Sequence, residues 1–439
     1  MSLLNLSLTR GWFPPVTLSL GLLAVALLVA GRPFTATGRR QWWTRRVPLG
    51  ILAGALAGGA VILIVDVLWR PFPDPLPRGV AVWTGLSAGG FALAVLRPGR
   101  ALGKALALLA VVVVVLAGMA QVNHTFGAYP TLRTALGLPF PGQVPFSQVA
   151  ASSTDLVKAP PGTALSTTWV PPANLPTRGV ITTAPIPGIR SGFAARSAWL
   201  YLPPAYLSTP RAQLPVLILL PGQPGSPRDW FDGGRLAQVM DTFAATHAGL
   251  APVVVVADPL GGLLANPLCV DSGKGNAFTY LSVDVPAWIR ATLQVDPDPR
   301  HWAVGGFSSG GTCALQLAVN APEVFPTFLD ISGQDEPTLG GRARTINQIF
   351  GGNAATFANV NPLDVLVRKR FPQTAGTIVA GSNDQRYRPQ ALVVLAATRA
   401  AGMHIRYLEL PGGHSWHVWR PGLADSLVWL ATRTGLSAG

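Results

Sequence analysis

Residues 301–319 read HWAVGGFSSGGTCALQLAV, an apolar run followed by the pattern G-x-S-x-G and then by a stretch suited to a helix. A serine held between a strand and a helix lies on a sharp turn, and glycines on either side keep side chains from clashing with neighbouring backbone. The segment therefore predicts a strand, a tight turn that presents Ser308, and a helix. The same pattern also occurs in TGLSAGG at 84–90, so the surroundings of each copy must decide which one has a chemical role.

From about residue 180 onward, short β-rich segments alternate with helical ones. Such alternation predicts a mostly parallel sheet with helices on both faces, in the layout of an α/β hydrolase. The copy at 305–311 lies inside this layout. The expected strands are 198–203, 215–222, 252–259, 301–308, 327–333, 376–383 and 404–412, and the expected helices are 280–293, 309–320, 387–401 and 419–433.

The N-terminal part of the chain has a different character. The whole sequence is 49% hydrophobic and only 12% charged, whereas about a quarter of the residues of a soluble protein are charged. Each of four apolar runs is close to the roughly 17–25 residues that cross a bilayer as a helix. We therefore predict an all-α region of four transmembrane helices over residues 1–121, with spans at 12–31, 47–69, 80–96 and 105–121.

This prediction separates the two serine motifs. Ser87 falls in the middle of the third span, and a continuous membrane helix cannot contain a strand-to-helix turn. The glycines around Ser87 are better explained by close approach of neighbouring helices. We therefore expect Ser308, and not Ser87, to be the reactive serine.

The net charge of +14 is concentrated in the first half of the chain. Residues 1–179 carry 14 Lys and Arg against 3 Asp, whereas residues 180–439 carry 19 against 16 acidic residues. Because the excess lies beside the apolar runs, membrane topology explains it better than a nucleic-acid partner. We expect the membrane, and no nucleic acid, as a partner.

The distribution of basic residues also predicts the orientation. The first and third connections between spans are Arg-rich, and the positive-inside rule places them in the cytoplasm. Everything after residue 121 is then extracytoplasmic, so we expect a multi-pass plasma-membrane protein. A cleaved signal peptide is the alternative for the first run, but Arg32, and no small-residue cleavage site, follows it. We expect a Pro-rich extracytoplasmic linker at 122–179 and a catalytic domain at 180–439.

A serine hydroxyl becomes a nucleophile when a neighbouring base takes its proton, and in this fold the acid and then the histidine follow the serine along the chain. Three of the six histidines precede Ser308, and His404 begins a predicted strand. His414, in LPGGHSWHVW, follows the last strand and is the expected base. His417 is its main rival, and an ordinary surface histidine is the other alternative.

Asp384, in AGSNDQRY, follows the penultimate strand and is the expected acid, because a buried carboxylate there would orient the imidazole. Its rivals are Asp335, Glu336 and Asp364, and an Asp in a polar loop can also simply cap a turn. We expect the backbone N–H groups of Gln223 and Ser309 to form the oxyanion hole that stabilises the tetrahedral intermediate. A Pro/Gly-rich surface turn remains the alternative for the loop that contains Gln223.

Several blocks together resemble the esterase family of α/β hydrolases that includes S-formylglutathione hydrolases, feruloyl esterases and antigen 85 type mycolyltransferases. The resemblance covers about residues 180–434 and implies Ser308, His414 and Asp384 as a catalytic triad, with Gln223 and Ser309 as the oxyanion hole. The blocks, in chain order, are LPVLILLPGQPGSPRDW, YLSVDVPAWI, HWAVGGFSSGGTCALQLAVNAPEVF, AGSNDQRY and LPGGHSWHVW.

Two departures qualify the resemblance. Pro221 stands where many relatives have a histidine, and the intact second glycine of the motif differs from mycolyltransferases, which commonly lack it. With the four N-terminal spans, the chain looks like a membrane-anchored esterase of actinobacteria.

The two cysteines, Cys269 and Cys313, both lie in the predicted catalytic domain, where an extracytoplasmic setting permits oxidation. A disulfide between them is favoured over two free thiols. No nucleotide loop or metal-ligand cluster is evident in the sequence, so we expect catalysis without a cofactor or metal.

These observations predict a membrane-anchored, extracytoplasmic serine esterase or acyltransferase. Its substrate would be an acyl ester, which in the cell envelope could be a lipid or glycolipid. Trp416 and Trp419 either line an apolar acyl or sugar site or pack in the core. The alternative function is a catalytically silent α/β-hydrolase-like binding or scaffolding module attached to a functional membrane region.

Overall fold

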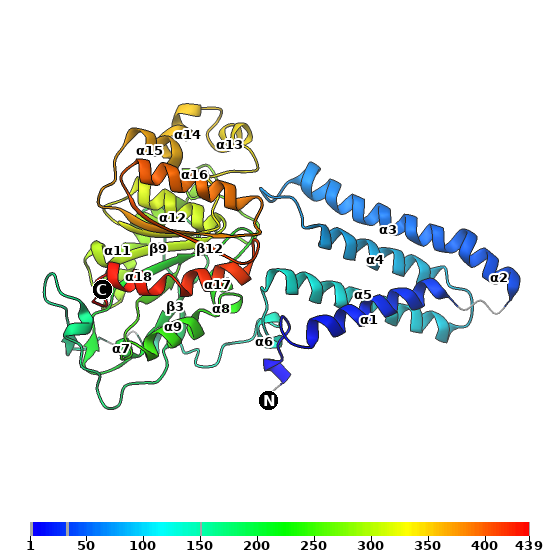
Figure 1. The fold of residues 1–439 in the computed structure, drawn as a ribbon, viewed down its shortest axis with the longest axis horizontal. Helices are drawn as coiled ribbons and strands as arrows, with labels where there is room; N and C mark the ends of the chain where they lie inside the picture. Colours follow the sequence, from blue (N-terminus) through cyan, green and yellow to red (C-terminus); the bar gives the residue numbers. More distant parts are fainter. Residues whose placement is uncertain (1–2, 32–34, 150–151, 439) are drawn as a thin grey trace. The chain divides into compact units, whose positions relative to one another are not determined.

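A computed structural model describes residues 3–31, 35–149 and 152–438, and it divides into two compact units, Met1–Leu138 and Pro139–Gly439 (Figure 1). The division falls inside the segment 122–179 that the sequence suggests as a linker. Residues after Pro139 belong to the second unit because they bind its strands. Val144 N donates to the Ile181 carbonyl oxygen over 2.9 Å, and β1 (Leu156–Val157) pairs in parallel with β4 (Arg211–Ala212).

Four apolar helical segments make up most of the first unit, and each is long enough to cross a membrane. They are α1 (Phe13–Ala30), the continuous helical run Ala36–Trp69 that contains α2 (Ala36–Gln41) and α3 (Val47–Ile62), α4 (Arg78–Val95) and α5 (Ala101–Phe126). Each predicted span coincides with one of them. The last helix extends five residues beyond the predicted end at 121.

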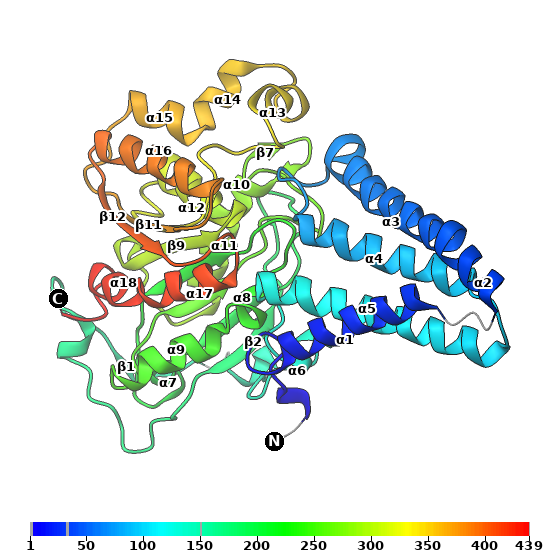
Figure 2. The ribbon, with the colours of Figure 1, turned by 45° about the vertical axis from the view of Figure 1, so that its right-hand side comes forward.

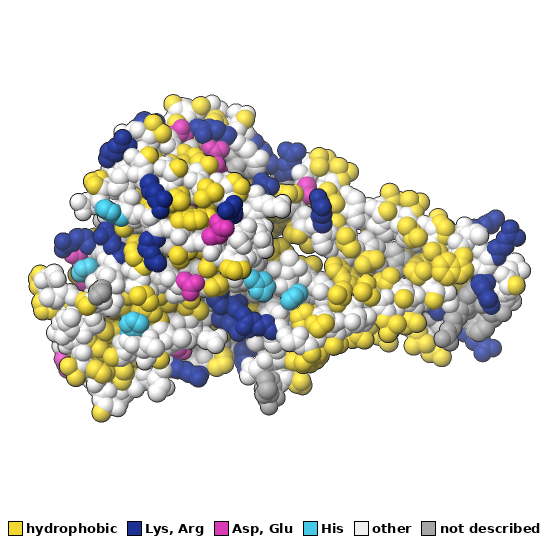
Figure 3. Space-filling view, in the orientation of Figure 1, with side chains coloured by type: hydrophobic (Ala, Val, Ile, Leu, Met, Phe, Trp, Pro, Cys, Tyr) yellow, Lys and Arg dark blue, Asp and Glu magenta, His cyan; other side chains and the backbone are white. Residues whose placement is uncertain are grey.

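The outer surface of this unit is apolar (Figure 3). Large hydrophobic side chains such as Leu23, Ile51 and Leu109 are more than half exposed. Lys and Arg side chains gather at the end of the unit that carries α2. An apolar surface of this size is expected where lipid, and not water, surrounds the helices.

Glycines set the packing of α3 against α4. A Cβ atom added to Gly54 would lie 2.7 Å from the Gly85 carbonyl oxygen, and one added to Gly89 would lie 2.8 Å from the Gly50 carbonyl oxygen. The two backbones are therefore in direct contact, as in small-residue interfaces of membrane helices. Ser87 lies between these contacts, within an unbroken helix.

We predict that Gly89→Leu will destabilise the helical unit by about 1–3 kcal/mol, because backbone on the facing helix cannot move aside as a side chain could. Gly59→Leu is the matched control, since no atom lies within 4 Å of a Cβ atom added there. Thermal unfolding of the detergent-solubilised chain measures both. Equal melting temperatures for the two variants would show that the backbone contact does not hold the helices together.

The second unit contains an eight-stranded sheet with the order β12-β11-β10-β9-β5-β6-β3-β2. The six strands from β12 to β6 are parallel, whereas β3 and β2 are antiparallel to their neighbours. The strands are β2 (Val180–Ala184), β3 (Ala198–Leu202), β5 (Val216–Leu220), β6 (Val253–Val256), β9 (Trp302–Phe307), β10 (Thr327–Ile331), β11 (Ala375–Gly381) and β12 (His404–Leu410). The predicted α/β-hydrolase fold is confirmed.

The central strands are mostly apolar and buried along their whole length, because helices cover both faces of the sheet. Every residue of β5, β6, β9, β10 and β11 is buried. On one face lie α12 (Ser309–Asn320), α15 (Pro362–Arg368) and α16 (Tyr387–Ala400), and on the other lie α8 (Asp229–Asp232), α9 (Leu236–Ala245) and α17 (Trp416–Ala424) (Figure 2).

Besides helices such as α9 and α15, which were not among those expected, two elements differ from the sequence expectation. The helix expected at 419–433 is two helices, α17 and α18 (Leu427–Arg433). The first begins early because the Ser415 side chain accepts a hydrogen bond from His417 N and caps it. β2 was not expected, since its sequence VITTA has a weak apolar signal and it pairs with only one strand of the sheet, at the sheet edge.

Candidate active site

Ser308 stands between β9 and α12 in a strained backbone conformation, with φ 54° and ψ −126°. Non-glycine residues rarely adopt positive φ, and such strain is concentrated at functional sites. A Cβ atom added to Gly306 would overlap the backbone of Gly310, and one added to Gly310 would overlap the carbonyl oxygens of Leu220 and Pro221. The start of α12 thus lies against the backbone at the ends of β9 and β5, and only glycine at 306 and 310 leaves room for this contact.

His414 and Asp384 come to Ser308 from the ends of neighbouring strands. His414 Nε2 lies 2.9 Å from Ser308 Oγ, and His414 Nδ1 lies 3.1 Å from Asp384 Oδ2. Ser308 and Asp384 are 7% and 5% exposed. The three side chains that were expected from the sequence therefore form one continuous chain of hydrogen bonds.

The loops that carry the acid and the histidine are tied to each other. Asn383 N donates to the Gly412 carbonyl oxygen over 2.9 Å, and a Cβ atom on Gly381 would lie 2.5 Å from the same oxygen. Asp384 Oδ1 accepts from the backbone N–H of Tyr387 at 3.0 Å and of Arg386 at 3.3 Å. The carboxylate is thus fixed by its own loop, and its second oxygen is left for His414.

Aromatic rings hold the imidazole from two sides. Tyr387 stacks on His414 with ring centroids 3.9 Å apart and an angle of 15° between the planes, whereas Trp419 meets it edge-on at 4.9 Å. Trp419 in turn stacks on Phe307, and Trp416 packs against both. The two tryptophans are buried and belong to this core. Tyr387 was not singled out in the sequence, although it lies three residues after Asp384.

The residues expected to form the oxyanion hole also lie at this turn. Ser309 is the first residue of α12, where N–H groups have no partner within the helix. Gly222, which precedes Gln223, passes so close to the nucleophile that an added Cβ atom would lie 3.2 Å from Ser308 Cβ. The Gln223 side chain donates from Nε2 to the Leu264 carbonyl oxygen over 3.3 Å.

Two of the rival acids are engaged elsewhere. Glu336 and Asp364 both bind Arg342, at 2.8 and 2.7 Å. Asp335 follows β10, and its backbone N–H donates to Gln390. His417 is exposed in the first turn of α17. Within the described residues, the carboxylates of Glu336 and Asp364 are therefore directed to Arg342 and not to the imidazole of His414.

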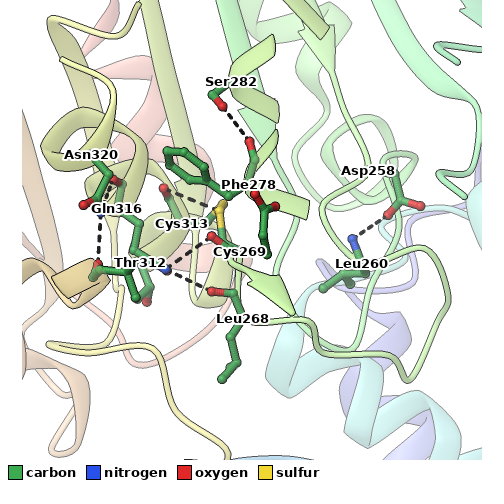
Figure 4. The surroundings of a disulfide bond; sticks show 12 residues. Asp258, Leu260, Leu268, Cys269, Phe278, Ser282, Thr312, Cys313, Gln316 and Asn320 are labelled. Carbon is green, nitrogen blue, oxygen red and sulfur yellow. Dashed lines mark hydrogen bonds between the residues drawn. A yellow bond between two sulfur atoms is a disulfide. The ribbon is translucent and has the colours of Figure 1, made fainter. Parts of the chain in front are cut away.

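A disulfide joins Cys269 to Cys313, with their Cα atoms 5.5 Å apart, and connects the loop after β6 to α12 (Figure 4). Leu268 and Cys269 have positive φ values of 61° and 57°, which cost roughly 1–2 kcal/mol each. Gln316 Nε2 donates to the Leu268 carbonyl oxygen at 3.0 Å and approaches that of Cys269 at 3.4 Å. The disulfide and Gln316 together hold this unfavourable backbone beside the nucleophile turn.

A buried acid lies under the turn. Asp330 on β10 is buried between the first turn of α12 and Gly333, whose N–H donates to Oδ1 over 2.9 Å. Desolvation raises the pKa of Asp330 to about 7, and the hydrogen bond from Gly333 only partly opposes this. Asp330 was not expected from the sequence, where it stands as one acid within an apolar strand.

The raised pKa predicts a pH-dependent stability. Between about pH 4, where the unfolded carboxyl ionises, and pH 7, the native state binds the extra proton, so the free energy of unfolding falls as pH rises. Asp330→Asn removes this contribution. We compare the free energy of unfolding of the variant with that of the native chain at each pH. We expect this difference to be more favourable to the variant at pH 8 than at pH 5, by on the order of 2 kcal/mol.

Thermal unfolding of the solubilised chain at the two pH values measures this difference. Asp425→Asn, at an exposed position, controls for the change in net charge. An equal effect of Asp330→Asn at pH 5 and pH 8 would rule out a neutral Asp330 in the native state.

Comparison with known proteins agrees with this fold. The fold and the Ser308 turn define an α/β hydrolase. The chain matches the family model described as "Putative esterase" over residues 195–430, more than half of its length. It belongs to this esterase family, which supports a hydrolase or acyltransferase activity on esters.

An uncharacterized protein of Corynebacterium glutamicum is 37% identical over 408 residues, which cover 91% of each chain. Since this match is longer than the second unit, it extends into the helical unit, and the two units recur together. Among solved structures, a ferulic acid esterase superposes with a TM-score of 0.52 at 18% identity, covering 58% of this chain and 99% of its own. An S-formylglutathione hydrolase from Agrobacterium tumefaciens has a TM-score of 0.50 at 18% identity, covering 60% and 98%. At this identity the two structures support the fold.

Proposed function

We propose that this protein is a membrane-anchored serine esterase or acyltransferase whose catalytic domain lies outside the cytoplasm and acts on acyl esters of the envelope. The observation that carries the proposal is the hydrogen-bonded order Ser308, His414, Asp384. A catalytically silent scaffold does not need a serine, a histidine and an aspartate joined by hydrogen bonds, whereas nucleophilic catalysis by a serine requires such an arrangement.

In this mechanism Ser308 Oγ attacks the ester carbonyl carbon while His414 Nε2 takes the hydroxyl proton. Asp384 stabilises the imidazolium, and the backbone N–H groups of Gln223 and Ser309 bind the oxyanion. The tetrahedral intermediate expels the alcohol, which takes the proton from His414. Water or a hydroxyl acceptor then attacks the acyl carbon while His414 Nε2 takes its proton. The bond from that carbon to Ser308 Oγ breaks as His414 gives the proton back to the serine.

Hydrolysis and transfer use the same protein groups. They differ in whether the acyl-enzyme meets water or a bound alcohol. The apolar helices favour a site at a membrane surface, where a lipid or glycolipid can serve as the ester or as the acceptor.

We predict that a fluorophosphonate probe will label the native chain in membranes and that Ser308→Ala will abolish labelling. His414→Ala should slow labelling at least 100-fold, because the base no longer removes the serine proton. Ser87→Ala and His417→Ala are matched controls that should label at the native rate. Absence of labelling in the folded native chain, or its persistence in Ser308→Ala, would overturn the triad.

The orientation has its own test. Alkaline phosphatase, which is active only outside the cytoplasm, is fused in turn after residues 40, 75, 100 and 125. We expect activity from the fusions after 75 and 125 and none from those after 40 and 100, because Arg-rich connections stay inside. Inactivity of the fusion after 125 would place the catalytic domain in the cytoplasm.

A further inference from the structure

One residue outside the proposed triad contacts both its acid and its base. Tyr387 is the first residue of α16 and is only 2% exposed. Its backbone N–H donates to Asp384 Oδ1 over 3.0 Å. Its ring stacks on the imidazole of His414, with the centroids 3.9 Å apart and the planes at 15°. Because the ring is buried, it cannot move off the imidazole without disturbing the surrounding core.

The geometry of this stack suits a positively charged imidazole. Aromatic rings generally prefer offset or edge-to-face arrangements, with centroids about 4.5–7 Å apart, over a direct face-to-face contact. The short centroid distance and nearly parallel planes leave the imidazole of His414 little offset from the face of the Tyr387 ring. That face is the negative side of the ring and attracts a cation, most strongly where water is excluded. The contact is therefore more favourable for the protonated imidazole than for the neutral one.

In the proposed mechanism, His414 gains its positive charge when Nε2 takes the proton of Ser308. Asp384 then acts on the edge of the imidazole, at Nδ1, over 3.1 Å. Tyr387 acts on the face of the same ring, so the two contacts do not compete. An interaction that is stronger in the transition state than in the ground state accelerates the reaction. The stack has this property because the charge develops only as the serine attacks.

We propose that Tyr387 is a positioning residue that acts through His414. The face of its ring fixes the imidazole and stabilises the positive charge that the imidazole gains from the serine proton. Trp419 has a different role, because its ring is nearly perpendicular to the imidazole, at 84°, and does not stack on it. The proposal rests on the esterase or acyltransferase function and adds a residue to its reacting centre.

Fluorination of the ring tests the proposal in the full-length solubilised chain. Phenylalanine and 3,4,5-trifluorophenylalanine at position 387 have nearly the same shape, but the fluorines withdraw electrons from the ring face and weaken its attraction for a cation. The readout is the rate constant of fluorophosphonate labelling, in which Ser308 Oγ bonds to phosphorus, fluoride leaves and His414 takes the serine proton. We expect the trifluorinated ring to label about 10-fold more slowly than Tyr387→Phe. Tyr387→Leu should be at least as slow, and Tyr387→Phe should restore most of the rate that Tyr387→Leu loses.

Phe243 is the matched control, because it stacks on His247 in the same geometry, with centroids 3.9 Å apart and planes at 12°. His247 is not part of the proposed triad, so trifluorophenylalanine at 243 should keep the native labelling rate. The melting temperature of each variant shows that the chain is folded. If the trifluorinated ring at 387 labels as fast as Tyr387→Phe, the role of Tyr387 is disproved while the proposed function stands. If the folded native chain is not labelled at all, the proposed function fails and the role of Tyr387 fails with it.

Discussion

The arrangement of the second unit depends on one close approach of backbones. The start of α12 passes so near the end of β5 that only glycine fits at residue 310, and it folds back so sharply on β9 that only glycine fits at 306. Ser308 is pushed into a positive φ between them. The surrounding strands are fully buried and parallel, so they cannot yield, and the strain persists because the sheet determines it.

The same pattern of residues has a different physical meaning in the first unit. Around Ser87 the glycines face the glycines of another helix, and the backbone between them is regular. In both places glycine permits two backbones to touch, but only beside a strand end does this contact force a serine out of the regular structure. Local sequence could separate the two copies because the flanking residues differ: an apolar strand precedes one copy, and a long apolar helix contains the other.

The sequence predicted the parallel sheet well because burial on both faces demands unbroken apolar strands such as VLILL and VVVV. It also located the side chains that meet at Ser308, since each follows a strand whose end faces the same edge of the sheet. What it did not predict depends on contacts between distant segments. The stacking of Tyr387 on His414 and the burial of Asp330 each require knowledge of which segment covers which, and β2 is an edge strand with a weak apolar signal.

The two oxygens of Asp384 are divided between its own loop and the imidazole. One oxygen accepts two backbone N–H groups and the other faces His414. An asparagine offers a single acceptor oxygen and an NH₂ group in place of the second. In one orientation of the amide, its NH₂ group faces the N–H groups of the loop, so that donor faces donor. In the other orientation, the NH₂ group faces the imidazole N–H of His414 and again donor faces donor. An asparagine at position 384 would therefore lose the hydrogen bonds either to its own loop or to His414. Only a carboxylate offers acceptors on both sides, and the negative charge comes with this ability.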